Sequence, residues 1–96
     1  MYVRMARFEG GDPAEADDMI ARVREMVEGE QPPGLEGARR LLLLLDRANV
    51  RGAGLMFFDS EEDMRRGDEA LNAMNPQGSG KRIAVEMYEV GLDHQF

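Results

Sequence analysis

The side chains that could take part in catalysis are few, and they cluster near the end of the chain. His94 is the only histidine among 96 residues, and it follows Asp93, which could orient an imidazole ring. Glu86 and Tyr88 are two positions apart, so a strand would present both on one face as a carboxylate base and a phenol donor. Tyr88, Glu86 and His94 are therefore the candidate catalytic residues.

Each candidate also has a purely structural interpretation. His94 is the third residue from the C-terminus, a region where chains are often disordered, so it could belong to a solvated tail or make a dimer contact. Glu86 could instead pair with Arg4 at an interface between subunits, with the Tyr88 hydroxyl buried beside that pair. Both interpretations stay open on the sequence alone.

Two other polar motifs do not support binding sites. The acidic run Glu61 to Asp63 could attract a hard cation, but it follows Ser60, and a capping residue followed by acids is typical of a helix start. Gly78-Ser79-Gly80-Lys81 resembles a phosphate-binding loop but has asparagine at position 75, where that loop needs glycine. The chain has no cysteine, which excludes thiolate nucleophiles and cysteine metal sites. We expect no metal and no cofactor.

Composition limits the partners. A formal net charge of −7 argues against a nucleic acid, which calls for basic surfaces. The longest apolar run, Leu41 to Leu45, is far too short to cross a membrane. Two arginines, Arg4 and Arg7, lie where a signal peptide would have its apolar core. We expect a single domain over residues 1–96, located in the cytoplasm, with no membrane or nucleic-acid partner.

Periodicity and breaker residues predict six elements. Strands are predicted over residues 2–8 and 82–90, a two-stranded hairpin over residues 37–58, and helices over residues 13–28 and 60–74. Asp12 and Pro13 begin the first helix, and Asn75-Pro76 is expected to stop the second. Gln77 to Lys81 reads as a flexible loop. The order of elements is βαββαβ.

The hairpin carries the main architectural inference. Leu41 to Leu45 is apolar at every position, so both faces of that strand must be covered. A chain of this length can cover one sheet face with its own helices, and we expect a second copy of the chain to cover the other. Gly52 and Gly54, two apart in the next strand, leave gaps on one face.

Short right-handed connections turn this order into an α+β, ferredoxin-like fold: a four-stranded antiparallel sheet with both helices on one face. The first and last strands are then neighbours, and we expect Arg4 and Glu86 to lie near each other on the face away from the helices. The helix-facing side is predicted to be apolar throughout. Its predicted members are Val3, Met5, Leu41, Leu43, Leu45, Leu55, Phe57, Ile83, Val85 and Met87.

Four stretches together resemble a known family. They are the strand end Arg7-Phe8-Glu9-Gly10, the approach Pro33-Gly34-Leu35-Glu36-Gly37-Ala38, the junction Phe57-Phe58-Asp59-Ser60-Glu61-Glu62-Asp63, and the closing Val85-Glu86-Met87-Tyr88-Glu89-Val90. The chain resembles the antibiotic biosynthesis monooxygenase-like group of the dimeric α/β-barrel superfamily. The resemblance implies a homodimer whose two sheets pack face to face into a barrel. Members include cofactor-independent monooxygenases acting on aromatic polyketides, haem-degrading enzymes and isomerases.

The resemblance does not transfer a catalytic residue. The haem-degrading members use an Asn, a Trp and a His, whereas this chain has no tryptophan and its histidine is in the tail. Two functions stay open. One is a homodimeric cofactor-independent monooxygenase or binding protein for a small apolar or aromatic ligand, with soft methionine-rich walls. The alternative is a non-catalytic dimerisation module with a filled core. Whether the protein is an enzyme is not decided by the sequence.

Overall fold

The structure, a computed structural model, describes residues 1–74 and 80–96. Its elements are β1 (Tyr2–Glu9), the 3-10 turn η1 (Pro13–Glu15), α1 (Ala16–Glu28), β2 (Ala38–Asp46), β3 (Arg51–Phe58), α2 (Glu61–Asn72) and β4 (Lys81–Glu89). The predicted βαββαβ order is confirmed. The expected helix stop at Asn75-Pro76 and the expected loop over residues 77–79 lie outside the described residues. Among the helices of the described part, none is long and apolar enough to cross a membrane.

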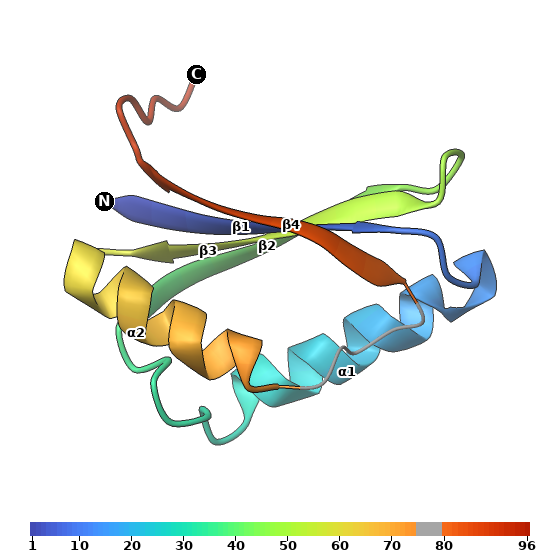
Figure 1. Ribbon diagram of the computed structural model, residues 1–96, viewed down its shortest axis with the longest axis horizontal. Helices are drawn as coiled ribbons and strands as arrows, with labels where there is room; N and C mark the ends of the chain where they lie inside the picture. The colour runs from blue at the N-terminus through green and yellow to red at the C-terminus, as the bar shows by residue number, and fades with distance from the viewer. Residues whose placement is uncertain (75–79) are drawn as a thin grey trace.

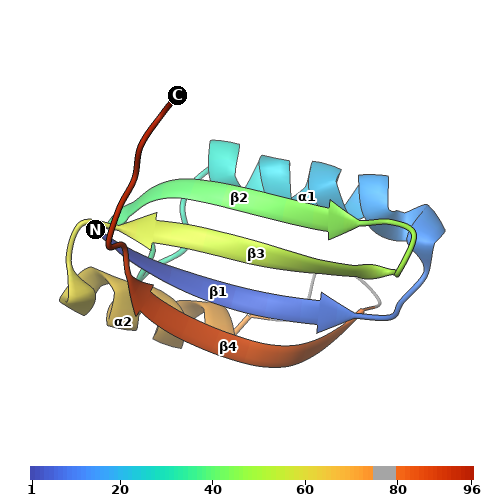
Figure 2. The same cartoon turned by 90° about the horizontal axis from the view of Figure 1, so that it is seen from above.

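The sheet has the strand order β2-β3-β1-β4, and every neighbouring pair is antiparallel. Both helices lie on one face of it, and the C-terminal residues extend from the other face (Figure 1). Figure 2 shows the two edge strands, β2 and β4, flanking the central pair β3 and β1. This arrangement confirms the predicted ferredoxin-like α+β fold. Below, the side that carries the helices is called the helix-side face, and the opposite side the outer face.

Helix α2 packs closely on the sheet. Ser60 begins it by accepting a hydrogen bond from the Asp63 amide at 3.1 Å, as the capping pattern predicts. Phe58 is fully buried against this helix, and its ring fills the space that a side chain on Gly67 would need. Leu35, Met56 and Met64 complete the small core, which therefore lies at the α2 end of the molecule.

Helix α1 is held at its N-terminal end. The Asp12 carboxylate accepts a hydrogen bond from the Ala14 amide at 2.9 Å, which confirms the predicted cap, although a 3-10 turn precedes the α-helix. Arg47, in the turn after β2, pairs with Asp17 at 2.9 Å and ties the hairpin tip to the start of the helix. The two contacts anchor the first turns of α1 on both sides.

The predicted pairing of Arg4 with Glu86 is wrong. Arg4 lies on the helix-side face, where its guanidinium contacts Asp68 of α2 at 2.7 Å. Its partner across the ladder is Met87, whereas Glu86 lies opposite Met5 and 3.5 Å from Arg7 on the outer face. The prediction assumed that a charged side chain points away from the helices. A carboxylate on α2 makes the opposite orientation favourable.

The predicted helix-facing set is correspondingly half wrong. Strand residues alternate, so the faces of β1 and β3 are the reverse of those expected. The correctly placed members are Leu41, Leu43, Leu45, Val85 and Met87, and those that lie on the outer face are Val3, Met5, Leu55 and Phe57. The helix-side face is thus not apolar throughout.

A β-bulge accounts for the remaining member, Ile83. Arg7 lies opposite Ala84 but Phe8 lies opposite Arg82, so Ile83 is an extra residue in β4. A bulge interrupts strict alternation. Arg82 therefore shares the helix-side face with Phe8 and does not follow Ala84, Glu86 and Tyr88 to the outer face.

Candidate functional site

A cavity of about 590 Å³ lies between α1 and the helix-side face of the sheet. This is within the range typical of small-molecule sites, about 300–1,000 Å³. Most of its wall is apolar. The apolar lining includes Met19, Val23 and Met26 from α1 and Ala6, Phe8, Leu41, Leu43, Leu45 and Met56 from the sheet. The cavity speaks against a filled core.

The two strand glycines, whose spacing predicted a shared face, both form part of this wall. A Cβ atom on Gly54 would meet only the Leu43 side chain, at an ordinary 3.6 Å, so the space above Gly54 is open. A Cβ atom on Gly52 would lie 2.6 Å from the Leu44 carbonyl oxygen, so glycine is required there by the close approach of β2. Gly54 therefore widens the cavity at β3, whereas the room left by Gly52 is taken up by β2.

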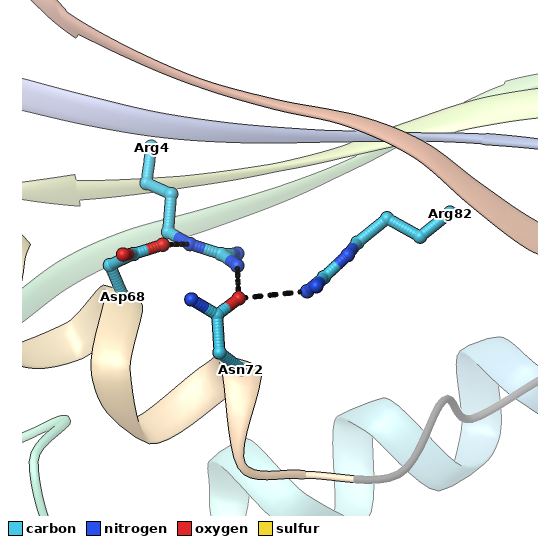
Figure 3. Close-up of polar contacts among 4 residues, drawn as sticks. All are labelled: Arg4, Asp68, Asn72 and Arg82. Atoms are coloured by element: carbon cyan, nitrogen blue, oxygen red, sulfur yellow. Dashed lines mark hydrogen bonds and ion pairs between the residues drawn. The ribbon is translucent and has the colours of Figure 1, made fainter.

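One end of the cavity is polar. Arg4, only 5% exposed, donates from Nε to Asp68 Oδ1 at 2.7 Å and from Nη2 to Asn72 Oδ1 at 3.0 Å. Arg82 Nη1 donates to the same Asn72 oxygen at 2.9 Å. Figure 3 shows the two guanidinium groups approaching Asn72 from β1 and β4. We call these four residues, Arg4, Asp68, Asn72 and Arg82, the arginine cluster.

The arginine cluster carries a surplus positive charge. Asp68 is within ion-pair distance of Arg4, but no carboxylate in the described part of the chain lies within 4 Å of the Arg82 guanidinium. The Asn72 amide is neutral and contributes only its oxygen to the two arginines. One uncompensated cation at a cavity wall is notable in a chain whose net charge is −7. Electrostatically, this end of the cavity favours an anionic group.

The residues singled out from the sequence lie elsewhere. Tyr88 donates its hydroxyl to Glu86 Oε2 at 2.5 Å, and Glu86 also lies 3.5 Å from Arg7. The hydrogen bond to the Glu86 carboxylate is the main reason why the pKa of Tyr88 is raised above its usual value of about 10. Tyr88 and Glu86 share the outer face, so the structure brings this pair together outside the cavity.

His94 lies in the exposed C-terminal tail, with its ring edge-on to Phe96 at 4.8 Å between centroids. It neither contacts the Tyr88–Glu86 pair nor lines the cavity. The catalytic roles of Tyr88, Glu86 and His94 remain predictions.

Sequence reasoning assigned Arg4 to a pair with Glu86 and did not single out Asp68, Asn72 or Arg82, so it missed the arginine cluster. A signal was present in α2, where Met64, Asp68 and Asn72 recur at intervals of four and so lie in one row. Met64 is buried, so the row that continues from it faces the sheet. A polar pair in that row required a polar partner on the helix-side face, and Arg4 was the charged residue in the middle of the neighbouring strand.

The fold and cavity define a class: a ferredoxin-like sheet with an open space between one helix and its inner face. No family description and no curated protein matches the sequence. Solved structures do match. A variant of the protein MhuD with two manganese protoporphyrin IX molecules bound per active site is 18% identical, with a TM-score of 0.68 and full coverage of both chains.

Two further structures agree. The heme-degrader MhuD from Mycobacterium tuberculosis, with two hemes bound in its active site, is 15% identical with a TM-score of 0.68, covering 99% of this chain and 100% of its own. A candidate antibiotic biosynthesis monooxygenase from Deinococcus radiodurans is 12% identical with a TM-score of 0.61, covering 100% of this chain and 98% of its own. The predicted resemblance to the antibiotic biosynthesis monooxygenase-like group is confirmed at the level of the fold.

Proposed function

We propose that this protein binds a flat, largely apolar aromatic molecule in the cavity between α1 and the sheet. The observation that carries the proposal is the cavity of about 590 Å³, whose wall is mostly apolar and which has the arginine cluster at one end. The structural neighbours support it, since two of them hold flat aromatic macrocycles in an active site. The alternative, a dimerisation module with a filled core, does not account for the open space above Gly54.

Haem itself does not fit this cavity well. Proteins usually hold haem iron through histidine, cysteine or tyrosine. The chain has no cysteine, its one histidine is in the tail, and neither tyrosine lines the cavity. The softest donors at the wall are methionine sulfurs, from Met19, Met26, Met56 and Met74, and methionine as an iron ligand is typically accompanied by histidine. We therefore propose a metal-free aromatic ligand.

The chemistry that this site favours is cofactor-independent oxygenation of a phenol. A phenol that gives its proton to water at the cavity mouth becomes an electron-rich anion, and positive charge at that mouth stabilises the anion. O2 is the oxidant: one of its oxygen atoms enters the ring to give a quinone, and the other leaves as water. Arg82 supplies that charge, since Arg4 is paired with Asp68, and the apolar walls exclude water from the bound rings. The assay is oxygen uptake with a hydroxyanthrone as substrate. If the wild type takes up oxygen no faster than the variant Gly54→Phe, whose added ring fills the cavity, the oxygenase part of the proposal is refuted.

Ligand binding is tested with the neutral fluorescent probe N-phenyl-1-naphthylamine. Gly54→Phe places a ring in the open space above β3, and Gly91→Phe adds the same ring outside the strands, where nothing lies within 4 Å of a new Cβ atom. We expect the wild type and Gly91→Phe to bind the probe alike and Gly54→Phe to lose binding. Unchanged binding by Gly54→Phe would show that the cavity is not the site.

We also propose that the outer face is the interface of a homodimer. Leu44 and Tyr88 are about half exposed there, at 49% and 48%, beside the partly buried Met5, Leu55 and Phe57. Covering this face fits a standard interface of about 800 Å² per partner. Sedimentation should give twice the mass of one chain, and Leu44→Glu should shift it toward the monomer. A single-chain mass for the wild type at micromolar concentration would refute the dimer.

A further inference from the structure

We infer that the arginine cluster is an anion subsite, so that the ligand of the cavity is an aromatic acid or an aromatic phenolate whose oxyanion is held by Arg82. This inference rests on the proposed function, because both place the ligand in the same cavity. It adds the group that holds the ligand, extends the ligand class to aromatic acids, and gives an orientation: the oxyanion at the α2 end, and the rings along α1 and β2.

Arg82 has donors to spare. A guanidinium carries five N–H donors in a planar fork that matches a carboxylate. In the described part of the chain only Arg82 Nη1 has a partner, the Asn72 oxygen at 2.9 Å. Arg82 is exposed, yet it lines the cavity, which places its guanidinium at the mouth. A ligand oxyanion there could accept from the remaining donors while part of it stayed in water.

The rest of the cluster positions this donor group. The buried Arg4 is fixed by Asp68, and it shares the Asn72 oxygen with Arg82. Both guanidinium groups donate to the Asn72 side-chain oxygen, and this fixes the orientation of the Asn72 amide. If the amide were flipped, its NH2 group, which is also a donor, would face both guanidinium groups. Arg82 is thus held toward the cavity from the protein side, and less side-chain freedom is lost on binding.

Other charges at the cavity wall favour the same orientation of the ligand. The carboxylates that line it are Asp12 and Glu15, around η1, and Asp46, at the end of β2. Asp46 is paired with Arg51 at 2.8 Å, and Arg47 with Asp17 at 2.9 Å. The two hairpin arginines in this wall, Arg47 and Arg51, are therefore each paired with a carboxylate, whereas Arg82 has none within 4 Å in the described part of the chain. The anionic end of a ligand belongs beside Arg4 and Arg82.

The test compares two probes with the same ring system. 8-Anilino-1-naphthalenesulfonate carries an oxyanion, and N-phenyl-1-naphthylamine lacks it. We expect Arg82→Ala to lower the affinity for the sulfonate probe about tenfold, which corresponds to the loss of one charge-assisted hydrogen bond. The affinity for the neutral probe should change by less than about twofold. Lys81→Ala is the matched control, because it removes the same charge from the neighbouring residue, which does not line the cavity. Arg82→Lys should bind the sulfonate with intermediate affinity.

The outcomes separate the two proposals. If neither probe binds the wild type, the proposed function fails. If the neutral probe binds but Arg82→Ala and Lys81→Ala have equal effects on the sulfonate probe, the anion subsite is overturned and the proposed function stands. If Gly54→Phe retains the sulfonate probe, that probe occupies another surface and the subsite is likewise overturned. Circular dichroism of each variant shows whether the fold is intact.

Discussion

Replacing Asp68 with asparagine should destabilise the protein by leaving the Arg4 charge without its counter-ion. Arg4 is 5% exposed, and the Asp68 side chain 20% exposed. Removing one partner of a buried ion pair costs about 3–5 kcal/mol, because the charge left behind is uncompensated. The partial exposure of Asp68 lets water take over some of that role, so we expect a loss of about 2 kcal/mol.

Arg4→Met should cost less than Asp68→Asn. Methionine fills most of the arginine stem volume, and the carboxylate left behind is the more exposed partner and can be hydrated. The double variant Arg4→Met/Asp68→Asn removes both charges and should recover part of the stability, since the buried charge that Asp68→Asn leaves uncompensated is then gone. The two sites are therefore expected to be coupled by at least about 1 kcal/mol.

The measurement is urea unfolding, monitored by circular dichroism, of the wild type, the two single variants and the double variant. The unfolding midpoints are compared on condition that the dependence of the unfolding free energy on urea concentration is the same in all four. A loss of 2 kcal/mol corresponds to a fall in Tm of at least about 8 °C for a domain of this size. Arg39→Met is the control, because the Arg39–Asp59 pair has the same 2.7 Å separation but is more than half exposed. Additive effects of the two single substitutions, within about 0.5 kcal/mol, would refute the view that Arg4 depends on Asp68.

Three further outcomes are expected. Gly67→Ala should destabilise the fold by about 1–3 kcal/mol in chemical denaturation, because its Cβ would lie 2.5 Å from Cζ of the fully buried Phe58; unchanged stability would mean that α2 can move away. Ser60→Ala should cost about 1 kcal/mol through loss of the α2 cap, with Ser60→Asp retaining most of the stability. In a Tyr2→Phe background, absorbance titration should give a raised pKa for Tyr88, and Glu86→Gln should return that pKa toward its usual value. The stability from the Tyr88–Glu86 bond should be fully present below the tyrosine pKa of the unfolded chain and lost as pH rises through the folded-state pKa; a titration identical in both proteins would contradict the assignment.

The order and type of the elements could be predicted from the sequence because the relevant signals are local. Asp12 and Ser60 cap helices through their own side chains, and prolines and glycines interrupt the pattern between elements. The glycine at position 54 was also correctly associated with space, whereas at position 52 the Leu44 carbonyl oxygen occupies the room that the missing side chain leaves.

The polar end of the cavity could not be predicted in the same way. Alternation shows which residues of a strand share a face, but not which face turns inward when both are apolar, as in β1 and β3. The choice depended on Asp68, a residue 64 positions away from Arg4. For Arg82 even the alternation failed, because the bulge at Ile83 depends on the pairing between strands.

That bulge also gives β4 one residue of spare chain length. Elsewhere in a paired strand, deleting one residue moves every side chain before or after the deletion to the opposite face of the sheet. At Ile83 a deletion would close the bulge, leaving Arg82 opposite Phe8 and Ala84 opposite Arg7 as before. Position 83 is therefore where β4 can shorten by one residue while Arg82 stays in the cavity wall and Glu86 and Tyr88 stay on the outer face.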